Sequence, residues 1–148
     1  MRAGRDRGPL IRDACAEDAA AIADLLGQLG YPAETDAVRP RLQRLAEAGD
    51  RLVVAEVDGE VVGLASLHVS PSLEYDEPAG KLAALVVAER HRGTGVGRAL
   101  VEAMEAEART RGCGAFFLTT AERRADAHAF YERLGLEYTG RRYAKTLT

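Results

Sequence analysis

Three glycines within five residues give the segment Arg92-Gly93-Thr94-Gly95-Val96-Gly97 the composition of a phosphate-binding loop. Glycine has no Cβ, so the backbone of such a loop can come close to a ligand. An apolar run precedes the loop, and an amphipathic helix is predicted directly after it. The first turn of that helix has N–H groups without intrahelical partners, and it carries the positive end of the helix dipole. This arrangement predicts a site for a phosphate group.

Two common phosphate-binding motifs do not fit the residues that follow. A Walker loop ends in Gly-Lys followed by Ser or Thr, whereas Gly97 is followed by Arg98 and Ala99. A dinucleotide-binding fingerprint that starts at Gly93 and Gly95 needs a third glycine at position 98, where an arginine stands. The sequence therefore disfavours a nucleotide-binding protein of either kind. The six letters alone leave open a glycine-rich turn that binds no ligand.

The periodicity of apolar residues predicts the elements that position this loop. Their order is β α α β β β α β α β β, which indicates an α/β chain without an internal repeat. Helices are predicted over 22–29, from Thr35 or Asp36 onward, over 96–111 and over 127–134, and Pro40 requires the second helix to start later or to bend. Strands are predicted over 10–14, 51–57, 60–69, 82–87, 115–119, 136–138 and 141–147, with a hairpin turn at Asp58-Gly59.

Length and charge limit the class of protein. The chain has 148 residues, enough for one domain, and we assign residues 1–8 to a flexible N-terminal segment and residues 9–148 to that domain. Its 20 basic and 23 acidic residues give a net charge of −3, which disfavours a nucleic acid or a membrane as partner. No stretch fits a membrane span or a signal peptide, and Cys15 and Cys113 lack the spacing of a metal site. We therefore expect a metal-free cytoplasmic protein with reduced cysteines.

The glycine loop resembles that of one enzyme superfamily. The pattern Arg/Gln-x-x-Gly-x-Gly/Ala, met by Arg92, Gly95 and Gly97, is similar to the coenzyme A pyrophosphate loop of the GNAT superfamily of N-acetyltransferases. The predicted order of elements is also that of the GNAT fold, and the loop falls between the fourth strand and the third helix, as in that fold. The resemblance implies an α/β fold, with a mixed central sheet of about seven strands and four helices.

A second stretch resembles another GNAT signature, Ala-x-x-Phe-Tyr-x-x-x-Gly-Phe. Ala127, Phe130, Tyr131 and Gly135 match it in register, and Leu136 stands in place of the last phenylalanine. Two motifs at the separation that the family shows make a chance resemblance improbable, so the chain is identified as a member of the GNAT superfamily.

The resemblance implies that the chain binds acetyl-CoA (coenzyme A) as a co-substrate. The pantetheine arm would pair with a distorted strand before the loop, and the Val87 N–H would face the thioester carbonyl as an oxyanion donor. Tyr131 would protonate the departing thiolate as general acid, although its spacing also fits a core aromatic. Arg98 is either a phosphate ligand or part of a surface ion pair. The residues implied in coenzyme binding are Leu85, Val86, Val87, Arg92, Gly93, Thr94, Gly95, Val96, Gly97 and Arg98.

Two positions depart from the family pattern. Many relatives carry an asparagine seven residues before the tyrosine, where this chain has Arg124. Many also carry a glutamate early in the fourth strand that acts as general base through water, and here Lys81 stands near that place. Residues 82–85 cannot take a proton, so the general base is not identified. The alternatives are a water chain that ends in solvent and the side chains of His68, Glu74, Asp76 and Glu77.

The expected reaction is direct transfer of the acetyl group to a primary amine of a small molecule or a protein. Because the family glutamate is missing, a second hypothesis is a catalytically weak acyl-CoA-binding sensor or partner subunit. A homodimer is also expected, since many relatives pair through edge strands and residues 141–147 could offer such an edge.

Overall fold

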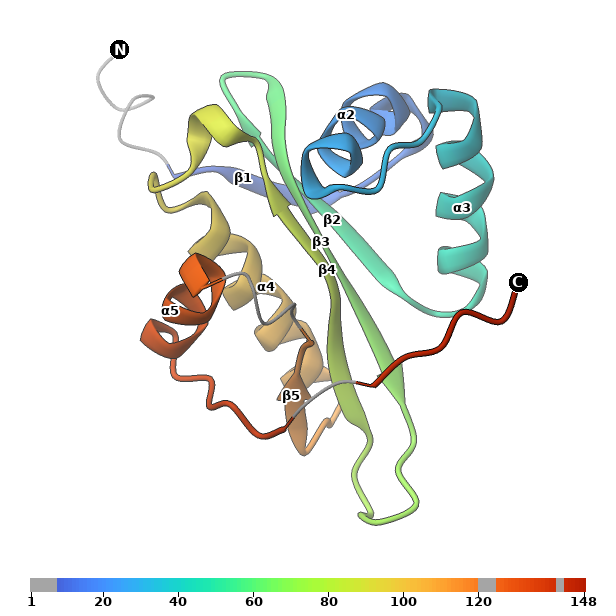
Figure 1. Cartoon of the computed structure of the whole chain (residues 1–148), viewed down its shortest axis with the longest axis vertical. Coiled ribbons are helices and arrows are strands. Elements are labelled where there is room, and N and C mark those ends of the chain that lie inside the picture. The colour runs from blue at the N-terminus through green and yellow to red at the C-terminus, as the bar shows by residue number, and fades with distance from the viewer. Residues whose placement is uncertain (1–7, 120–124, 141–142) are drawn as a thin grey trace.

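The computed structural model describes residues 8–119, 125–140 and 143–148, and a single sheet lies at the centre of the molecule (Figure 1). The predicted N-terminal segment therefore lies outside the described residues except for Gly8, as do Arg124 and Arg141. The sheet has the strand order β1-β2-β3-β4-β5. All neighbours are antiparallel except β4 and β5, which are parallel, so the sheet is mixed. Its strands are β1 (Leu10–Asp13), β2 (Arg51–Val57), β3 (Glu60–Ser70), β4 (Ala79–Val87) and β5 (Ala115–Phe117).

In the part of the chain that the structure describes, four α-helices cover the two faces of the sheet. Helices α2 (Ala19–Leu29) and α3 (Thr35–Glu47) lie on one face, and α4 (Val96–Thr110) and α5 (Ala125–Arg133) lie on the other (Figure 1). Two short 3-10 helices, η1 (Ala16–Asp18) and η2 (Glu89–His91), precede α2 and the glycine loop. The four helices are those that the sequence predicts. Within the described residues, no helix combines the length and apolar composition needed to cross a membrane.

The hydrophobic core lies where the helices pack against the central strands. Leu25 of α2, Leu64 of β3 and Leu100 of α4 are among the largest fully buried side chains. Helix α4 approaches β3 so closely that a Cβ added to Gly63 would lie 3.0 Å from Leu100 Cδ1. This contact fixes α4, and with it the loop that precedes α4, relative to the sheet.

Helix α3 contains Pro40 and does not start after it. Helix α3 begins at Thr35 and continues through Pro40 as its sixth residue. A proline removes the N–H that would bond to the carbonyl four residues earlier, here that of Asp36. Because Asp36 is in the first turn and exposed, water can hydrate its carbonyl, and the buried Val38 still anchors the helix.

The predicted closing strand pair is wrong for the residues that the structure describes. Leu136–Tyr138 was expected to form one strand and Arg141–Leu147 another, but residues 136–140 and 143–148 form no strand, so the sheet has five strands rather than about seven. Tyr138, Tyr143 and Leu147 are 63%, 89% and 88% exposed. A strand keeps its register when one of its faces is buried, and these apolar side chains bury none.

Candidate active site

The glycine loop has the backbone geometry that its composition predicts. Gly93 and Gly95 have φ angles of 79° and 94°, a region that side chains with a Cβ rarely adopt. Gly95 caps α4, and the first bond within that helix runs from Ala99 N–H to Gly95 O at 3.1 Å. The N–H groups of residues 96–98 therefore lie in the first turn without a helical carbonyl partner.

Gly97 is the point where three elements meet. A Cβ at this position would lie 3.2 Å from Phe130 Cζ and 3.6 Å from Val87 Cγ2. The start of α4 thus lies against both the end of β4 and Phe130 on α5. A Cβ at position 97 would require Phe130 to shift by a few tenths of an ångström, so glycine permits the closest approach of these elements.

Strand β4 presents an open backbone edge next to the loop. Strand β5 pairs with β4 only from Ala79 to Lys81 in the described part of the chain. Val87 lies opposite Gly63 on β3, and the neighbouring Ala88 N–H donates to Val62 O at 2.7 Å. Alternate residues of a strand direct their N–H and C=O groups to opposite sides, so those of Val87 face away from β3. The same alternation directs the backbone groups of Leu85 to the open edge.

A bulge in β4 lies just before this edge. Ala84 pairs with Ser66 and Leu82 pairs with Leu67, which leaves Ala83 as an extra residue. A bulge bends its strand and increases the local twist, and here it lies just past the last residues that pair with β5. The family resemblance implied a distortion at residues 85–87, and the bulge in the structure lies just before them, at Ala83, in the pairing with β3.

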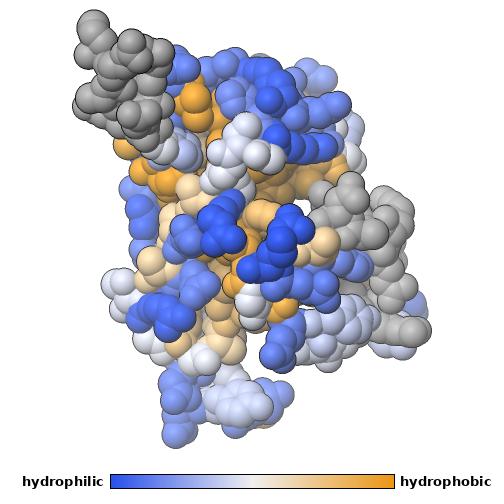
Figure 2. Space-filling view, turned by 90° about the vertical axis from the view of Figure 1, so that its left-hand side faces the viewer, coloured by the Kyte–Doolittle hydropathy of each residue, from blue (hydrophilic) through white to orange (hydrophobic). Residues whose placement is uncertain are grey.

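The loop, the open edge and α5 enclose one cleft of about 740 Å³. Arg92, the glycines of the loop, residues 85–87 and Tyr131 all line it, although the two motifs are far apart in the sequence. Of the expected coenzyme ligands, Thr94 and Val96 do not line it: Thr94 Oγ1 donates to His91 O, and Val96 is 2% exposed. The wall also contains Leu29, Ala127, Phe130, Arg133 and Leu134, whose contact with the cleft was not predicted. Figure 2 shows the molecule from the side of α4 and α5, where hydrophobic surface lies between hydrophilic residues.

Tyr131 is half-buried in α5 beside Phe130. The two rings meet edge to face, with centroids 5.4 Å apart. The carbonyl of Tyr131 accepts hydrogen bonds from the N–H groups of Leu134 and Leu136, each at 3.1 Å, and Gly135 ends the helix with a φ of 89°. These contacts hold the backbone of Tyr131, so the ring has a defined place in the wall of the cleft.

Two arginines of the loop make contacts within the protein. Arg92 Nε donates to Val87 O at 3.3 Å, which is one of the backbone groups on the open edge. Arg98 lies 3.6 Å from Glu102, one turn later on α4, with both side chains more than half exposed. An exposed pair of this kind holds its partners weakly, so Arg98 can both line the cleft and form the ion pair.

None of the candidate bases lines the cleft among the described residues. His68 Nδ1 lies 2.6 Å from Asp50 Oδ1, and across the sheet His68 pairs with Lys81. The turn that carries Glu74, Asp76 and Glu77 lies at the opposite end of β4 from Val87 (Figure 1). Nine residues of strand span about 30 Å, so these carboxylates lie far from the open edge.

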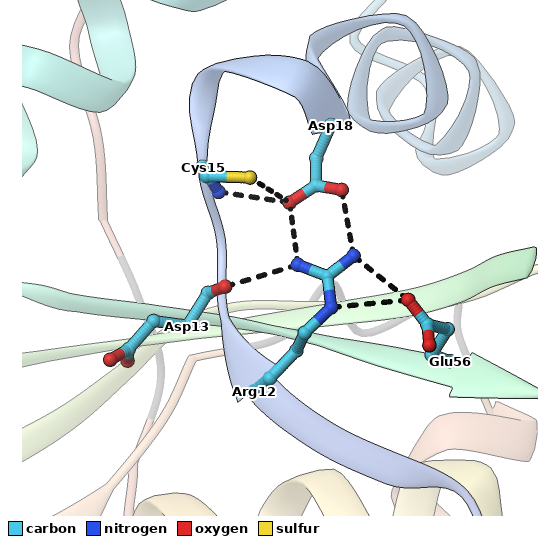
Figure 3. Close-up of polar contacts among 5 residues, drawn as sticks. All are labelled: Arg12, Asp13, Cys15, Asp18 and Glu56. Atoms are coloured by element: carbon cyan, nitrogen blue, oxygen red, sulfur yellow. Dashed lines mark hydrogen bonds and ion pairs between the residues drawn. The ribbon is translucent and has the colours of Figure 1, made fainter. Parts of the chain in front are cut away.

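A network around Arg12 fixes the helix that supplies Leu29 to the cleft. The Arg12 guanidinium donates two hydrogen bonds of 2.9 Å to Asp18, at the start of α2, and bonds of 3.1 and 3.0 Å to Glu56 on β2 (Figure 3). The hydrogen bonds from Arg12 lower the pKa of Asp18, and the two carboxylates raise the pKa of Arg12. The carboxylate of Asp18 also accepts from the Cys15 N–H at 2.9 Å. The network thus ties the N-terminal end of α2 to two strands.

Cys15 is exposed, and its thiol donates a hydrogen bond to Asp18 Oδ2 at 3.4 Å. Hydrogen bonds to Glu17 and Asp18 raise its pKa, and the thiolate is the nucleophilic form. Cys113 is half-buried, and both thiols are free. A covalent route through Cys15 is therefore disfavoured.

At the opposite end of α2, Gln28 contacts the approach to the loop. The Glu89 N–H, at the start of η2, donates to Gln28 Oε1 at 2.9 Å. Helix α2 is thus held at its beginning by Arg12 and at its end by the segment that leads into the glycine loop.

The sequence and the fold of this chain are similar to those of known acetyltransferases. Residues 19–136 match the model of the Acetyltransferase (GNAT) family. The chain is 36% identical over 138 residues to an aminoglycoside N(6′)-acetyltransferase type 1 of Stenotrophomonas maltophilia, with 90% of this chain and 89% of that protein covered. It is 34% identical over 154 residues to an aminoalkylphosphonate N-acetyltransferase of Salmonella typhimurium, with 99% and 98% covered. A Trypanosoma brucei acetyltransferase structure superposes with a TM-score of 0.81 at 26% identity, with 95% of this chain and 100% of that chain covered.

Proposed function

Because this chain belongs to the GNAT family of acetyltransferases, we propose that it transfers the acetyl group of acetyl-CoA directly to a primary amine of a small molecule. The observation that carries this proposal is the single cleft that joins the glycine loop, the open edge of β4 and Tyr131. The coenzyme supplies the acetyl group in the activated form of a thioester. The residues of the cleft bind it and stabilise the charges that develop.

The loop fits the pyrophosphate of the coenzyme. The free N–H groups of residues 96–98 and the positive end of the α4 dipole favour an anion. Gly93 and Gly95 have positive φ angles, which favour glycine, and glycine has no side chain that could stand between these N–H groups and the ligand. Arg92 and Arg98 line the same cleft and add charge-assisted hydrogen bonds to phosphate oxygens.

The open edge of β4 fits the pantetheine arm. The N–H and C=O groups of Leu85 and Val87 face this edge, and an extended chain with amide groups can pair with them as an added strand. The Val87 N–H is the proposed donor to the thioester oxygen, where negative charge develops as the amine attacks. Only the backbone of Val87 takes part in this step, so the identity of its side chain matters little for it.

Tyr131 is the proposed general acid. A phenol can give a proton to the departing thiolate, and the ring lies in the wall of the cleft that contains the open edge. Its packing against Phe130 is compatible with this role, because the packing involves the ring while proton transfer involves the hydroxyl group.

The names of two relatives support the proposed acceptor class. Two of the relatives are named for acetyl transfer to an aminoglycoside and to an aminoalkylphosphonate, which are both small molecules with amino groups. We therefore place a small-molecule amine ahead of a protein amine as acceptor.

One observation favours a second candidate function. No carboxylate or histidine is among the described residues that line the cleft, and Lys81 stands near the place of the family's glutamate. A chain that binds acetyl-CoA without an efficient base would act as an acyl-CoA sensor or partner subunit.

A screen of amines separates the two functions. The purified chain is incubated with acetyl-CoA and a panel that includes aminoglycosides, aminoalkylphosphonates, polyamines and amino acids, and free thiol is measured against a reaction without amine. Release that depends on one class of amine supports the transferase. Binding of acetyl-CoA by calorimetry, without amine-dependent thiol release from any member, supports the sensor, and failure to bind acetyl-CoA contradicts both.

A further inference from the structure

Arg133 is a third arginine in the wall of the cleft, and neither motif assigns it a role. It lies in the last turn of α5, on a different element from Arg92 and Arg98. Arg92 has Val87 O as a partner, and Arg98 has Glu102. Arg133 forms no ion pair in the part of the chain that the structure describes, and no carboxylate is among the described residues of the cleft wall. Its positive charge is therefore not neutralised by the wall itself.

The position of Arg133 places its charge near the glycine loop but not on it. Phe130 contacts the position of Gly97 at the start of α4, and Arg133 follows Phe130 by one turn of α5, an axial rise of about 4.5 Å. An anion that is bound at the loop therefore has Arg133 nearby on the facing wall. A second anionic group of the same ligand can reach Arg133 while the first stays at the loop.

Coenzyme A has such a second group. Its pyrophosphate fits the free N–H groups of the loop, and its 3′-phosphate is a separate monoester, which carries about −1.5 to −2 charges at pH 7. An arginine with no carboxylate partner is suited to such a group, because the guanidinium can donate two hydrogen bonds to a phosphate. On the basis of the proposed function, we propose that Arg133 binds the 3′-phosphate and makes the cleft prefer coenzyme A over 3′-dephospho-coenzyme A.

Two other roles for Arg133 make different predictions. An arginine in the last turn of a helix is stabilised by the negative end of the helix dipole, and a purely structural role of this kind would leave the affinity for both ligands unchanged. If Arg133 instead bound the pyrophosphate, its loss would weaken both ligands equally, since both contain that group.

The test compares the two ligands by calorimetry on the wild-type chain, Arg133→Met and the control Arg109→Met. Arg109 is an exposed arginine of α4 that pairs with Glu105 outside the cleft. We expect Arg133→Met to weaken coenzyme A binding about tenfold or more, because a hydrogen bond to a charged group contributes about 1.5–3 kcal/mol. Its affinity for 3′-dephospho-coenzyme A should change less than about twofold on the same grounds, and Arg109→Met should match the wild type with both ligands.

Each remaining outcome overturns the proposal. If Arg133→Met loses the same affinity for both ligands, Arg133 binds the pyrophosphate rather than the 3′-phosphate. If its affinity for coenzyme A is unchanged, Arg133 has only a structural role. Retained binding of 3′-dephospho-coenzyme A also shows that Arg133→Met is folded. A wild-type chain that binds neither ligand would contradict the proposed function itself, which distinguishes that failure from a failure at Arg133.

Discussion

Replacing Gly95 by valine tests whether the glycine loop binds the coenzyme. Gly95 has a φ of 94° at the start of α4, and a Cβ built on it meets no atom within 4 Å. The protein itself therefore has room for a Cβ at this position. Two effects remain: backbone strain, because valine rarely adopts a positive φ, and obstruction of the space in front of the N–H groups of residues 96–98.

The size of each effect can be worked out separately. A residue with a side chain in this backbone region costs about 1–3 kcal/mol, and a domain of this length loses about 2–4 °C in Tm per kcal/mol. Losing one hydrogen bond between the loop and a phosphate costs about 1.5–3 kcal/mol, which corresponds to about a tenfold to hundredfold loss of affinity. Strain lowers the Tm, whereas obstruction lowers the affinity of the folded protein.

The control is Gly112→Val at the other end of the same helix. Gly112 has a φ of 78°, and a Cβ there also meets no atom within 4 Å, so the strain is matched while the site lies outside the cleft. Both variants should show a similar loss of Tm by calorimetry, and only Gly95→Val should lose affinity for acetyl-CoA in a titration below its Tm. If the two folded variants bind acetyl-CoA equally well, the loop is not the phosphate site.

Three further predictions concern catalysis, acid stability and assembly. Tyr131→Phe should lower turnover about a hundredfold or more, the usual scale of general-acid assistance, with an unchanged Kd for acetyl-CoA; wild-type turnover where chemistry limits the rate would leave Tyr131 a packing role. Hydrogen bonds from Arg12 lower the pKa of Asp18, so their stabilisation is present above the unfolded pKa of about 3.9 and is lost as the pH falls through the lower folded value. Asp18→Asn should therefore lower the free energy of unfolding by about 1–3 kcal/mol near pH 7, and its Tm should fall less steeply below pH 4 than that of the wild type. If the Tm of both proteins falls equally steeply below pH 4, Asp18 does not have this role. A homodimer is still proposed, but residues 143–147 form no strand that could supply its edge; a monomer mass at every concentration in analytical ultracentrifugation would contradict it.

The family and the fold could be predicted because local signals coincide with them. The two motifs identified the GNAT family, which the match over residues 19–136 confirms, and the four helices follow from apolar spacing. The hairpin at Asp58-Gly59 also forms as predicted, with φ angles of 52° and 79°. These features depend on residues that are close in the sequence, so a short window contains the information.

The rest of the site depends on contacts between distant elements. The bulge at Ala83 lies within an uninterrupted apolar run, so no letter marks it. Leu29 and Arg133 reach the cleft only because α2 and α5 pack at its two sides, which no periodicity indicates. The C-terminal residues include side chains that are common in strands, but a strand keeps its register only when one of its faces is buried, and here Tyr138 and Tyr143 remain exposed.

The contact between Gly97 and Phe130 gives a physical reason for the two motifs to occur together. Gly97 belongs to the loop, and Phe130 is the neighbour of Tyr131, so a gap of 3.2 Å between the Cβ position of Gly97 and Phe130 Cζ sets the distance from the loop to the proposed acid. A larger residue at position 97 would push α5 away and would move the Tyr131 hydroxyl relative to a ligand held at the loop. Misplacement of a reacting group by about 1 Å can cost about a hundredfold in rate. The absence of a side chain at position 97 therefore serves two purposes: the coenzyme can approach the backbone, and Phe130 can pack against α4 without the shift of a few tenths of an ångström that a Cβ would require.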